Sequence, residues 1–227
     1  ADKVSLALLK FFTVLTSLGA KERLALSFRH MNDDPQNHIR VIPPLLRREV
    51  TLHEPYSGDY IHGYMVNAGF SENVMKWHRQ HPGIPLRFFW DKWEEEPVKR
   101  VDNTLSFYQL DDVEFLRQMA GCKAYASTAG FESVCEAMYL GKPILMVPAH
   151  IEQDCNAYDA EKSGAGIISS DFNLQQLLEF AKDYHPNRDF VYWVRGAEYT
   201  LLNLLESDSS NYQQVLFNEM YLVEEFI

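Results

Sequence analysis

Residues 127–137 place hydroxyl groups, a glycine and a carboxylate in an order that suits an anionic ligand carrying a diol. Gly130 opens a predicted helix, with the hydroxyls of Thr128 and Ser133 on either side of it. A phosphate here would accept hydrogen bonds from these groups and gain about 0.3–1 kcal/mol from the helix dipole. Glu136 lies three residues beyond Ser133 on one side of the helix, and a carboxylate accepts from two vicinal hydroxyls at once. The same spacing also fits a Ser-x-x-Glu helix cap, so this motif alone leaves both interpretations open.

A second loop has similar chemistry in a weaker form. Asn67, Ala68 and Gly69 separate an apolar strand, residues 61–66, from a helix over residues 71–80. Small residues at such a junction let a phosphate approach the backbone and the N–H groups of the helix. A tight turn that needs the backbone freedom of glycine is the simpler interpretation of this loop taken alone.

The third loop, residues 148–156, follows an apolar strand over residues 143–147. Glu152 and Gln153 present adjacent groups that can accept from and donate to sugar hydroxyls. His150 has the chemistry of a general base, but no Ser or Cys stands at the spacing of a nucleophilic triad, so a structural role is favoured for it.

Alternating strands and helices predict how these loops are positioned. Each expected strand is a short apolar run and each expected helix starts near a capping residue, Ser71 for the first and Asp111 or Asp112 for the second. The strands span residues 61–66, 86–90, 105–107, 124–126, 143–147 and 167–168, and the helices 71–80, 111–119, 131–140, 153–163 and 174–182, with a charged loop over 93–103. This alternation predicts an α/β fold, a Rossmann-like parallel sheet with helices on both faces. Ligands bind such sheets at the carboxyl ends of the strands, where the three loops meet.

The two ends of the chain look different from this middle part. Residues 1–19 show helical spacing of apolar side chains, which favours an amphipathic helix over a targeting segment. Short strands are expected over residues 24–28 and 39–42, followed by Pro43-Pro44 as a domain boundary. Helices are expected over residues 187–205 and 212–226.

Composition excludes several classes of function. The 227 residues are 46% hydrophobic and carry a net charge of −11, which opposes nucleic acid as the main partner. The three cysteines, Cys122, Cys135 and Cys155, lack the spacing of a disulfide framework or a zinc site, which fits a reducing cytoplasm. No Asp-x-Asp motif for a catalytic metal occurs.

Taken together, the motifs form one ordered series that is more specific than its parts. Gly-aromatic-x-Ser-x-x-Glu-Ala at 130–137 is followed by Gly-x-Pro at 141–143, a strand ending in Pro148, and acidic-Gln-x-x-Asn at 152–156. The series resembles the donor-site signature of the nucleoside-diphosphate-sugar glycosyltransferases with two Rossmann domains (GT-B). It is similar to the plant secondary-product glycosyltransferases and to the bacterial N-acetylglucosaminyltransferase that makes the peptidoglycan lipid intermediate.

The resemblance implies a role for each part of the site. Diphosphate binding falls to Asn67, Ala68, Gly69, Thr128, Ala129, Gly130 and Ser133, ribose binding to Glu136, base binding to Phe107, Tyr108, Gln109 and Leu110, and sugar binding to His150, Glu152 and Gln153. Thr128 stands where many members have histidine and Glu132 where many have asparagine. Because a carboxylate pointing inward would repel a diphosphate, we expect Glu132 to point away.

The implied activity is that of the donor-binding part of an inverting, metal-independent glycosyltransferase. Such an enzyme moves a sugar from a nucleoside diphosphate, here expected to be UDP, to a hydroxyl group of an acceptor. No cofactor is expected. Residues 1–44 are then the tail of an absent N-terminal acceptor domain with its linker, 45–206 the nucleotide-sugar domain, and 207–227 a helix crossing back to the absent domain. The catalytic base is unknown, since His30 is expected to be a surface residue, and the fragment alone is expected to be inactive.

The expected partners are the nucleotide-sugar donor and the N-terminal acceptor domain, with attachment to the inner face of the membrane if the acceptor is a lipid. Two alternatives remain open at this point. A non-hydrolysing nucleotide-sugar 2-epimerase shares the architecture, and a non-catalytic nucleotide-sugar-binding module would need the same loops.

Overall fold

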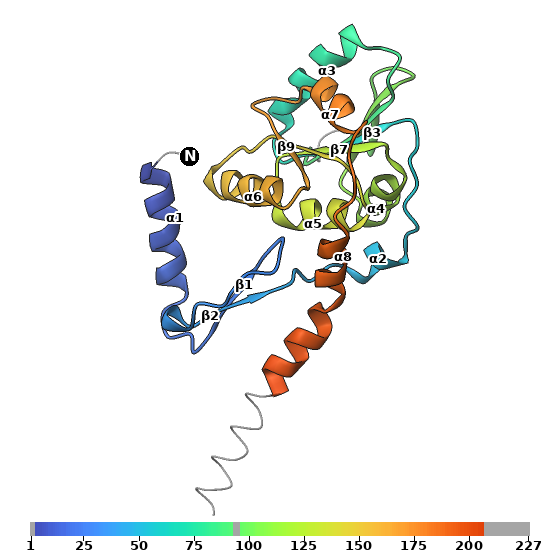
Figure 1. Cartoon of the computed structure of the whole chain (residues 1–227). Helices are drawn as coiled ribbons and strands as arrows, with labels where there is room; N and C mark the ends of the chain where they lie inside the picture. Colours follow the sequence, from blue (N-terminus) through green and yellow to red (C-terminus); the bar gives the residue numbers. More distant parts are fainter. Residues whose placement is uncertain (1–2, 93–95, 207–227) are drawn as a thin grey trace, which may run out of the picture.

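The computed structural model describes residues 3–92 and 96–206 and is built around a seven-stranded sheet (Figure 1). Its strands are β3 (Ile61–Met65), β4 (Leu86–Trp90), β5 (Val98–Arg100), β6 (Leu105–Gln109), β7 (Ala124–Ser127), β8 (Ile144–Met146) and β9 (Gly166–Ile168). The order across the sheet is β5-β6-β4-β3-β7-β8-β9. All neighbours run parallel except β5, which pairs antiparallel with β6 at one edge.

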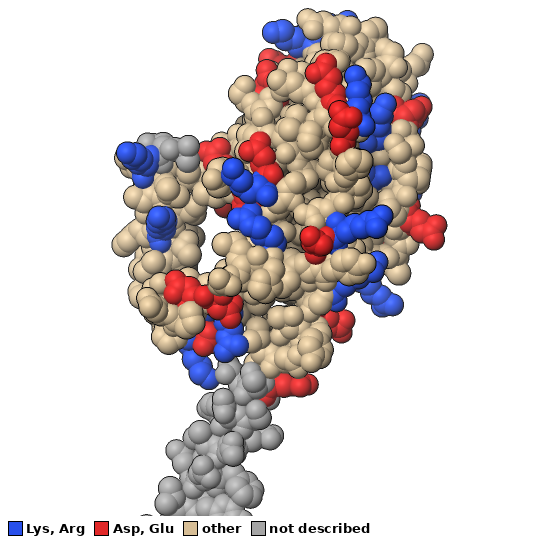
Figure 2. Space-filling view, viewed as in Figure 1, with Lys and Arg blue, Asp and Glu red and all other residues tan. Residues whose placement is uncertain are grey.

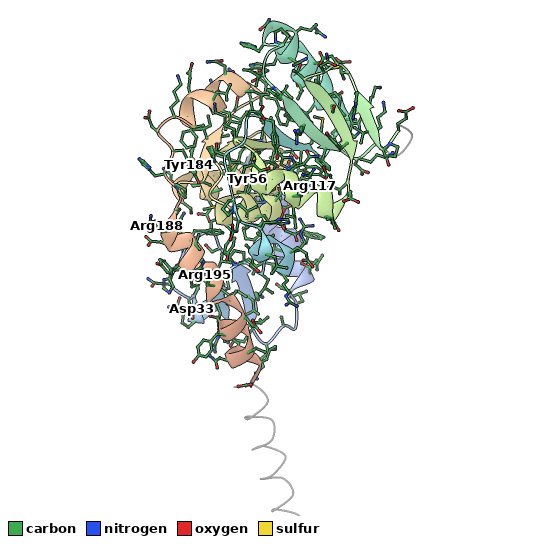
Figure 3. The ribbon with its side chains drawn as sticks, turned by 90° about the vertical axis from the view of Figure 1, so that its right-hand side faces the viewer. Asp33, Tyr56, Arg117, Tyr184, Arg188 and Arg195 are labelled. Carbon is green, nitrogen blue, oxygen red and sulfur yellow. The ribbon has the colours of Figure 1, made fainter. Side chains whose placement is uncertain are left out.

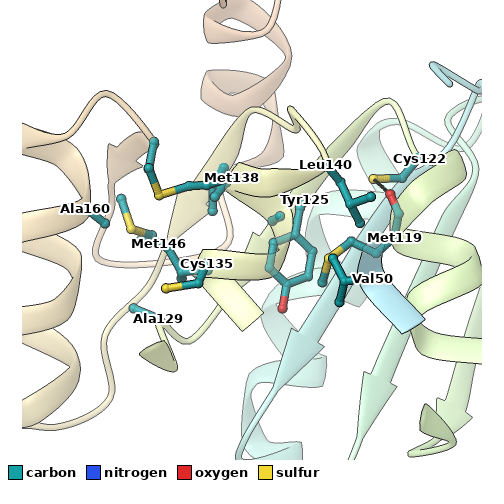
Figure 4. Packing of buried hydrophobic residues seen from close by; sticks show 14 of the residues in the cluster. Val50, Met119, Cys122, Tyr125, Ala129, Cys135, Met138, Leu140, Met146 and Ala160 are labelled. Atoms are coloured by element: carbon teal, nitrogen blue, oxygen red, sulfur yellow. Dashed lines mark hydrogen bonds between the residues drawn. The ribbon is translucent and has the colours of Figure 1, made fainter. Parts of the chain in front are cut away.

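Helices cover both faces of this sheet, which confirms the predicted Rossmann-like fold. One face carries α3 (Ser71–Gln80) and α7 (Leu174–Phe180), and the other carries α4 (Asp112–Gly121), α5 (Phe131–Tyr139), α6 (Ile151–Lys162) and α8 (Arg188–Arg195). Successive strand residues point to opposite faces, so each strand feeds two cores. In β7, Tyr125 enters the core beneath α5 (Figure 4), while Ala124 and Ala126 enter the core beneath α3 and α7.

The direction of the crossovers changes between β3 and β7. From β3 the chain proceeds to β4 and then β6 on one side, and afterwards returns to place β7, β8 and β9 on the other side. At such a switch point the loops leave the sheet in opposite directions and open a crevice at the carboxyl ends of the strands. The loops after β3 and β7 therefore flank the place where this fold binds ligands.

The N-terminal segment forms a separate small layer. Strands β1 (Arg23–Leu26) and β2 (Ile39–Ile42) pair in parallel, and α1 (Lys3–Thr16) stands beside them near α6 (Figure 1). No residue of α1 is buried, and Figure 2 shows its surface to be mostly uncharged. Pro43 and Pro44, the predicted boundary, are both buried directly after β2.

Several local predictions need correction. The loop predicted over residues 93–103 contains the edge strand β5, which is too short and too charged to show an apolar pattern. A short helix, α2 (Arg48–Leu52), follows the proline pair and was not predicted. Ser71 is the first residue of α3 and not its cap.

The helix expected over residues 187–205 is interrupted at Gly196, after which residues 197–206 are helical again. The predicted cap of α4 is confirmed, since the Asp111 side chain accepts from Glu114 N at 2.8 Å. The helix expected over 212–226 lies outside the described residues.

Candidate functional site

The two loops at the switch point are joined by a buried threonine. Thr128 follows β7, is fully buried, and accepts a hydrogen bond from Val66 N at the end of β3, with an N–O distance of 3.3 Å. In the loop after β3, Asn67 Oδ1 accepts from Gly69 N at 2.8 Å and caps a single 3-10 turn, Ala68–Phe70. Thr128 thus fixes the spacing of the two loops, and its hydroxyl oxygen already has a protein partner.

The turn from β7 into α5 leaves the N-terminus of that helix open. Ala129 has φ = 63°, a left-handed conformation that is uncommon for a residue with a Cβ and that marks many functional turns. Gly130 is the N-cap residue of α5, and no side chain caps the helix. Ser133 Oγ donates to Gly130 O at 3.3 Å, so it lies within the first turn, and the Ser-x-x-Glu capping interpretation does not hold.

A cleft of about 270 Å³ opens in front of this helix N-terminus. It brings together residues from five parts of the chain: the segment before α2, the strand β3, the loop after β6, α4 and α5. The lining residues are Arg47, Tyr64, Leu110, Asp112, Phe115, Gly130, Phe131, Glu132, Ser133 and Glu136. Four of them, Leu110, Gly130, Ser133 and Glu136, belong to the predicted site.

Glu136 lies at the base of the cleft and forms a bidentate ion pair that sequence analysis missed. Arg47 Nε donates to Oε1 at 2.7 Å, and Arg47 Nη2 donates to Oε2 at 2.8 Å. The Glu136 side chain has no exposed surface, and its burial raises the pKa of the carboxyl group while Arg47 opposes that rise. No local sequence signal predicts this contact, because the two residues are 89 positions apart.

Two exposed carboxylates stand at the rim of the cleft. Asp112 Oδ1 lies 3.2 Å from Arg47 Nη1, and Glu132 Oε1 lies 3.9 Å from Arg47 Nε. Glu132 therefore lines the cleft, and the prediction that it points away is wrong. Arg47 carries the positive charge of this cleft, and its attraction for the Glu132 carboxylate accounts for the orientation of Glu132.

The predicted base-binding residues divide between two faces of β6. The Phe107 ring is buried against Trp90 with centroids 4.4 Å apart, in the core on the α3 side, where no ligand reaches it. Tyr108 points to the opposite face and stacks on Phe89 at 5.0 Å. Leu110, at the end of the strand, is 40% exposed and lines the cleft.

The loop after β8 lies next along the same edge of the sheet but does not line the cleft. His150 is exposed at the N-cap of α6, and Glu152 is exposed in the first turn of that helix. Gln153 is buried, and its Oε1 accepts from Ala149 N at 2.9 Å, which shapes the loop. Asn156 Nδ2 contacts Ala129 O at 3.5 Å and connects this loop to the turn before α5.

A larger cavity, of about 490 Å³, lies at the amino-terminal ends of β7 and β8, on the side of the sheet opposite to the carboxyl ends where the cleft opens. Tyr56 and Tyr184 line it and lie near each other in Figure 3. Lys142 is buried there and donates to Tyr56 O at 2.7 Å and to Cys122 O at 3.0 Å. These bonds occupy the ammonium group in holding the chain together, so the smaller cleft at the switch point is the stronger site.

The described residues contain neither a metal-ion site nor a membrane-spanning helix. No group of three His, Cys, Asp or Glu side chains is arranged to hold a metal ion there. No helix among those residues has the length and apolar character needed to cross a bilayer.

Comparison with known proteins agrees with this architecture. The profile of glycosyl transferase family 1 matches residues 15–184. A putative UDP-glucuronosyltransferase, ugt-48 of Caenorhabditis elegans, is 26% identical over 105 residues, which are 45% of this chain and 20% of the relative. The chain thus spans far less than the full length of this curated relative.

Solved glycosyltransferases share the fold at low sequence identity. The glycotransferase of kitacinnamycin matches 76% of this chain and 50% of its own, with 14% identity and a TM-score of 0.54. The calicheamicin glycosyltransferase CalG4 matches 75% and 48%, with 13% identity and a TM-score of 0.53. The family profile covers well over half of the 227 residues. The chain belongs to glycosyl transferase family 1.

Proposed function

We propose that this chain binds the sugar donor of an inverting, metal-independent glycosyltransferase. The enzyme moves a sugar from a nucleoside diphosphate, which we propose to be UDP, to a hydroxyl group of the acceptor. The diphosphate lies at the open N-terminus of α5, the ribose contacts Glu136, and the base lies toward Leu110. The loop after β8, with His150, Glu152 and Gln153, faces the sugar.

The observation that carries this proposal is the cleft in which Glu136 and the open helix N-terminus stand together. Uncapped N–H groups of the first turn stabilise a diphosphate both as a ligand and as a leaving group on which negative charge develops. Ser133 adds a hydroxyl within the same turn. Arg47 offsets one of the three negative charges that line the cleft, those of Asp112, Glu132 and Glu136, and lies closest to Glu136.

The acceptor side of the reaction is proposed to come from a second domain that covers α1 and the small sheet. Apolar side chains of α1 such as Leu8, Phe11 and Phe12 are each more than 60% exposed. Exposed apolar surface of this kind is typical of a site that contacts another protein or a membrane. We propose that the same domain supplies the general base.

Calorimetry with UDP, GDP and dTDP tests the proposal. We expect UDP to bind most tightly, and failure of all three to bind at millimolar concentration contradicts it. Incubation with UDP-N-acetylglucosamine in the absence of an acceptor then tests the alternative reaction. The appearance of an epimer would show a 2-epimerase and overturn the transferase assignment.

A further inference from the structure

Arg47 stands where the N-terminal layer meets the nucleotide cleft. It is the N-cap residue of α2, three residues after Pro44, and Val50 of the same helix is buried in the core beneath α4. The Arg47 side chain extends from this anchored segment into the cleft, where it is 28% exposed. The backbone of this segment therefore determines where the guanidinium group lies.

Each nitrogen atom of the guanidinium group faces a carboxylate. Nε and Nη2 hold the two oxygens of Glu136 at 2.7 and 2.8 Å, and Nη1 lies 3.2 Å from Asp112 Oδ1. Two parallel bonds of this kind fix the plane of a carboxylate as well as its position. A guanidinium engaged in this way orients another group and is not free to act as a separate phosphate ligand.

The bidentate pair leaves Glu136 able to receive a diol. A carboxylate has about four acceptor positions on its two oxygens, and Arg47 occupies one on each oxygen. One acceptor position remains on each oxygen. Because the Glu136 side chain has no exposed surface in this structure, a hydroxyl reaches these positions only when the residues that cover the carboxylate move aside. Without Arg47, the buried carboxyl group would gain a proton more readily and would be free to rotate, so it would no longer accept from two hydroxyls.

We propose that Arg47 is a positioning residue for nucleotide recognition, which holds the Glu136 carboxylate in the orientation that accepts the 2′- and 3′-hydroxyls of the ribose. The inference rests on the proposed function, because it concerns the same cleft. It adds that the segment after Pro44 is part of the nucleotide site, and that a displacement of this segment changes recognition of the ribose.

The test compares the affinities for UDP and for 2′-deoxy-UDP in the 227-residue chain. Loss of one hydrogen bond to a charged group weakens binding by about 10- to 150-fold, so the wild-type chain should prefer UDP by a factor in this range. In Arg47→Met, which keeps the length of the stem, we expect the preference to fall below about 3-fold. Arg47→Lys should give an intermediate preference, since a lysine makes no bidentate contact.

Arg48→Met is the matched control. Arg48 is the next residue, is exposed, and does not line the cleft, so its replacement removes the same charge and should leave the preference unchanged. Circular dichroism of each variant monitors the fold. A general loss of structure would weaken binding of both nucleotides equally, whereas loss of positioning changes their ratio.

The possible outcomes separate the two proposals. If neither nucleotide binds the wild-type chain, the proposed function itself fails. If UDP binds but Arg47→Met keeps the full wild-type preference, the role of Arg47 is refuted and nucleotide binding stands. If the wild-type chain binds both nucleotides equally, Glu136 does not read the ribose and the inference fails with it.

Discussion

Replacement of Gly130 by alanine separates the stability of the fold from binding of the proposed ligand. Gly130 has φ = −63° and ψ = 134°, which alanine adopts without strain. A Cβ at this position would meet only Ser133 Oγ, at 3.7 Å, which is an ordinary contact. The protein therefore has room for the methyl group, but that group would occupy the side of the cleft where a phosphate must approach the backbone.

Stability and binding are expected to respond differently. Alanine restricts the unfolded chain, which favours folding by about 0.4–1 kcal/mol, but it is a poorer N-cap residue than glycine by a comparable amount, so the two contributions largely cancel. The Tm should therefore stay within about 4 °C of the wild-type value. Loss of one N–H bond to a phosphate costs about 1.5–3 kcal/mol, so UDP should bind about 10- to 150-fold more weakly.

Thermal melts and calorimetry of Gly130→Ala measure both quantities. Gly83→Ala is the matched control, since a Cβ there meets nothing within 4 Å and the residue lies in the exposed loop after α3. The control should keep the wild-type affinity. If Gly130→Ala binds UDP as tightly as the wild type does, no phosphate lies against Gly130 and the assignment of the diphosphate site is refuted.

Three further predictions concern the scaffold of the site. Burial among aromatic rings lowers the pKa of His62 to about 3, whereas the pKa of histidine in an unfolded chain is about 6.5. Between these two values the unfolded state binds one more proton than the folded state, so the free energy of unfolding falls as the pH decreases from about 6.5 toward 3. The free energy of unfolding should fall by about 2 kcal/mol between pH 7 and pH 5. In urea denaturation, His62→Phe should show a weaker dependence of this free energy on pH, and an unchanged dependence would show that His62 does not cause it. Gly63→Ala should lose about 1–3 kcal/mol of stability in the same assay, because a Cβ would overlap the Phe88 ring; wild-type stability would mean that this ring shifts freely. Thr128→Val should cost about 0.5–1.5 kcal/mol through the lost bond to Val66 N and should also weaken UDP binding, and an unaltered affinity would contradict its role in spacing the loops.

The sequence predicts the framework well because local chemistry determines it. Buried parallel strands are short apolar runs, and Leu86–Trp90 and Ile39–Ile42 were predicted with their observed bounds. The helix start at Asp111 is equally local, since it follows from a capping side chain. The three loops consequently fall at the same edge of the sheet, as predicted.

The parts that the sequence does not reveal depend on contacts between distant residues. Nothing in the sequence near Arg47 shows that its partner is Glu136, and the position of Glu132 at the rim of the cleft follows from its attraction to Arg47. The face to which Phe107 points depends on the register of β6 against β4, where it pairs with Phe88. These contacts join residues that are distant in the sequence, so they become visible only in the folded structure.

Binding of a nucleoside diphosphate in the cleft at the N-terminus of α5 underlies every role proposed above. Titration of the ¹⁵N-labelled chain with UDP, followed by backbone amide chemical shifts, tests this binding most directly. The largest changes are expected at Gly130, Ser133 and Glu136, with smaller changes at Gly69. Largest changes around Lys142, at the amino-terminal ends of β7 and β8, or no changes at millimolar UDP, would contradict binding in this cleft.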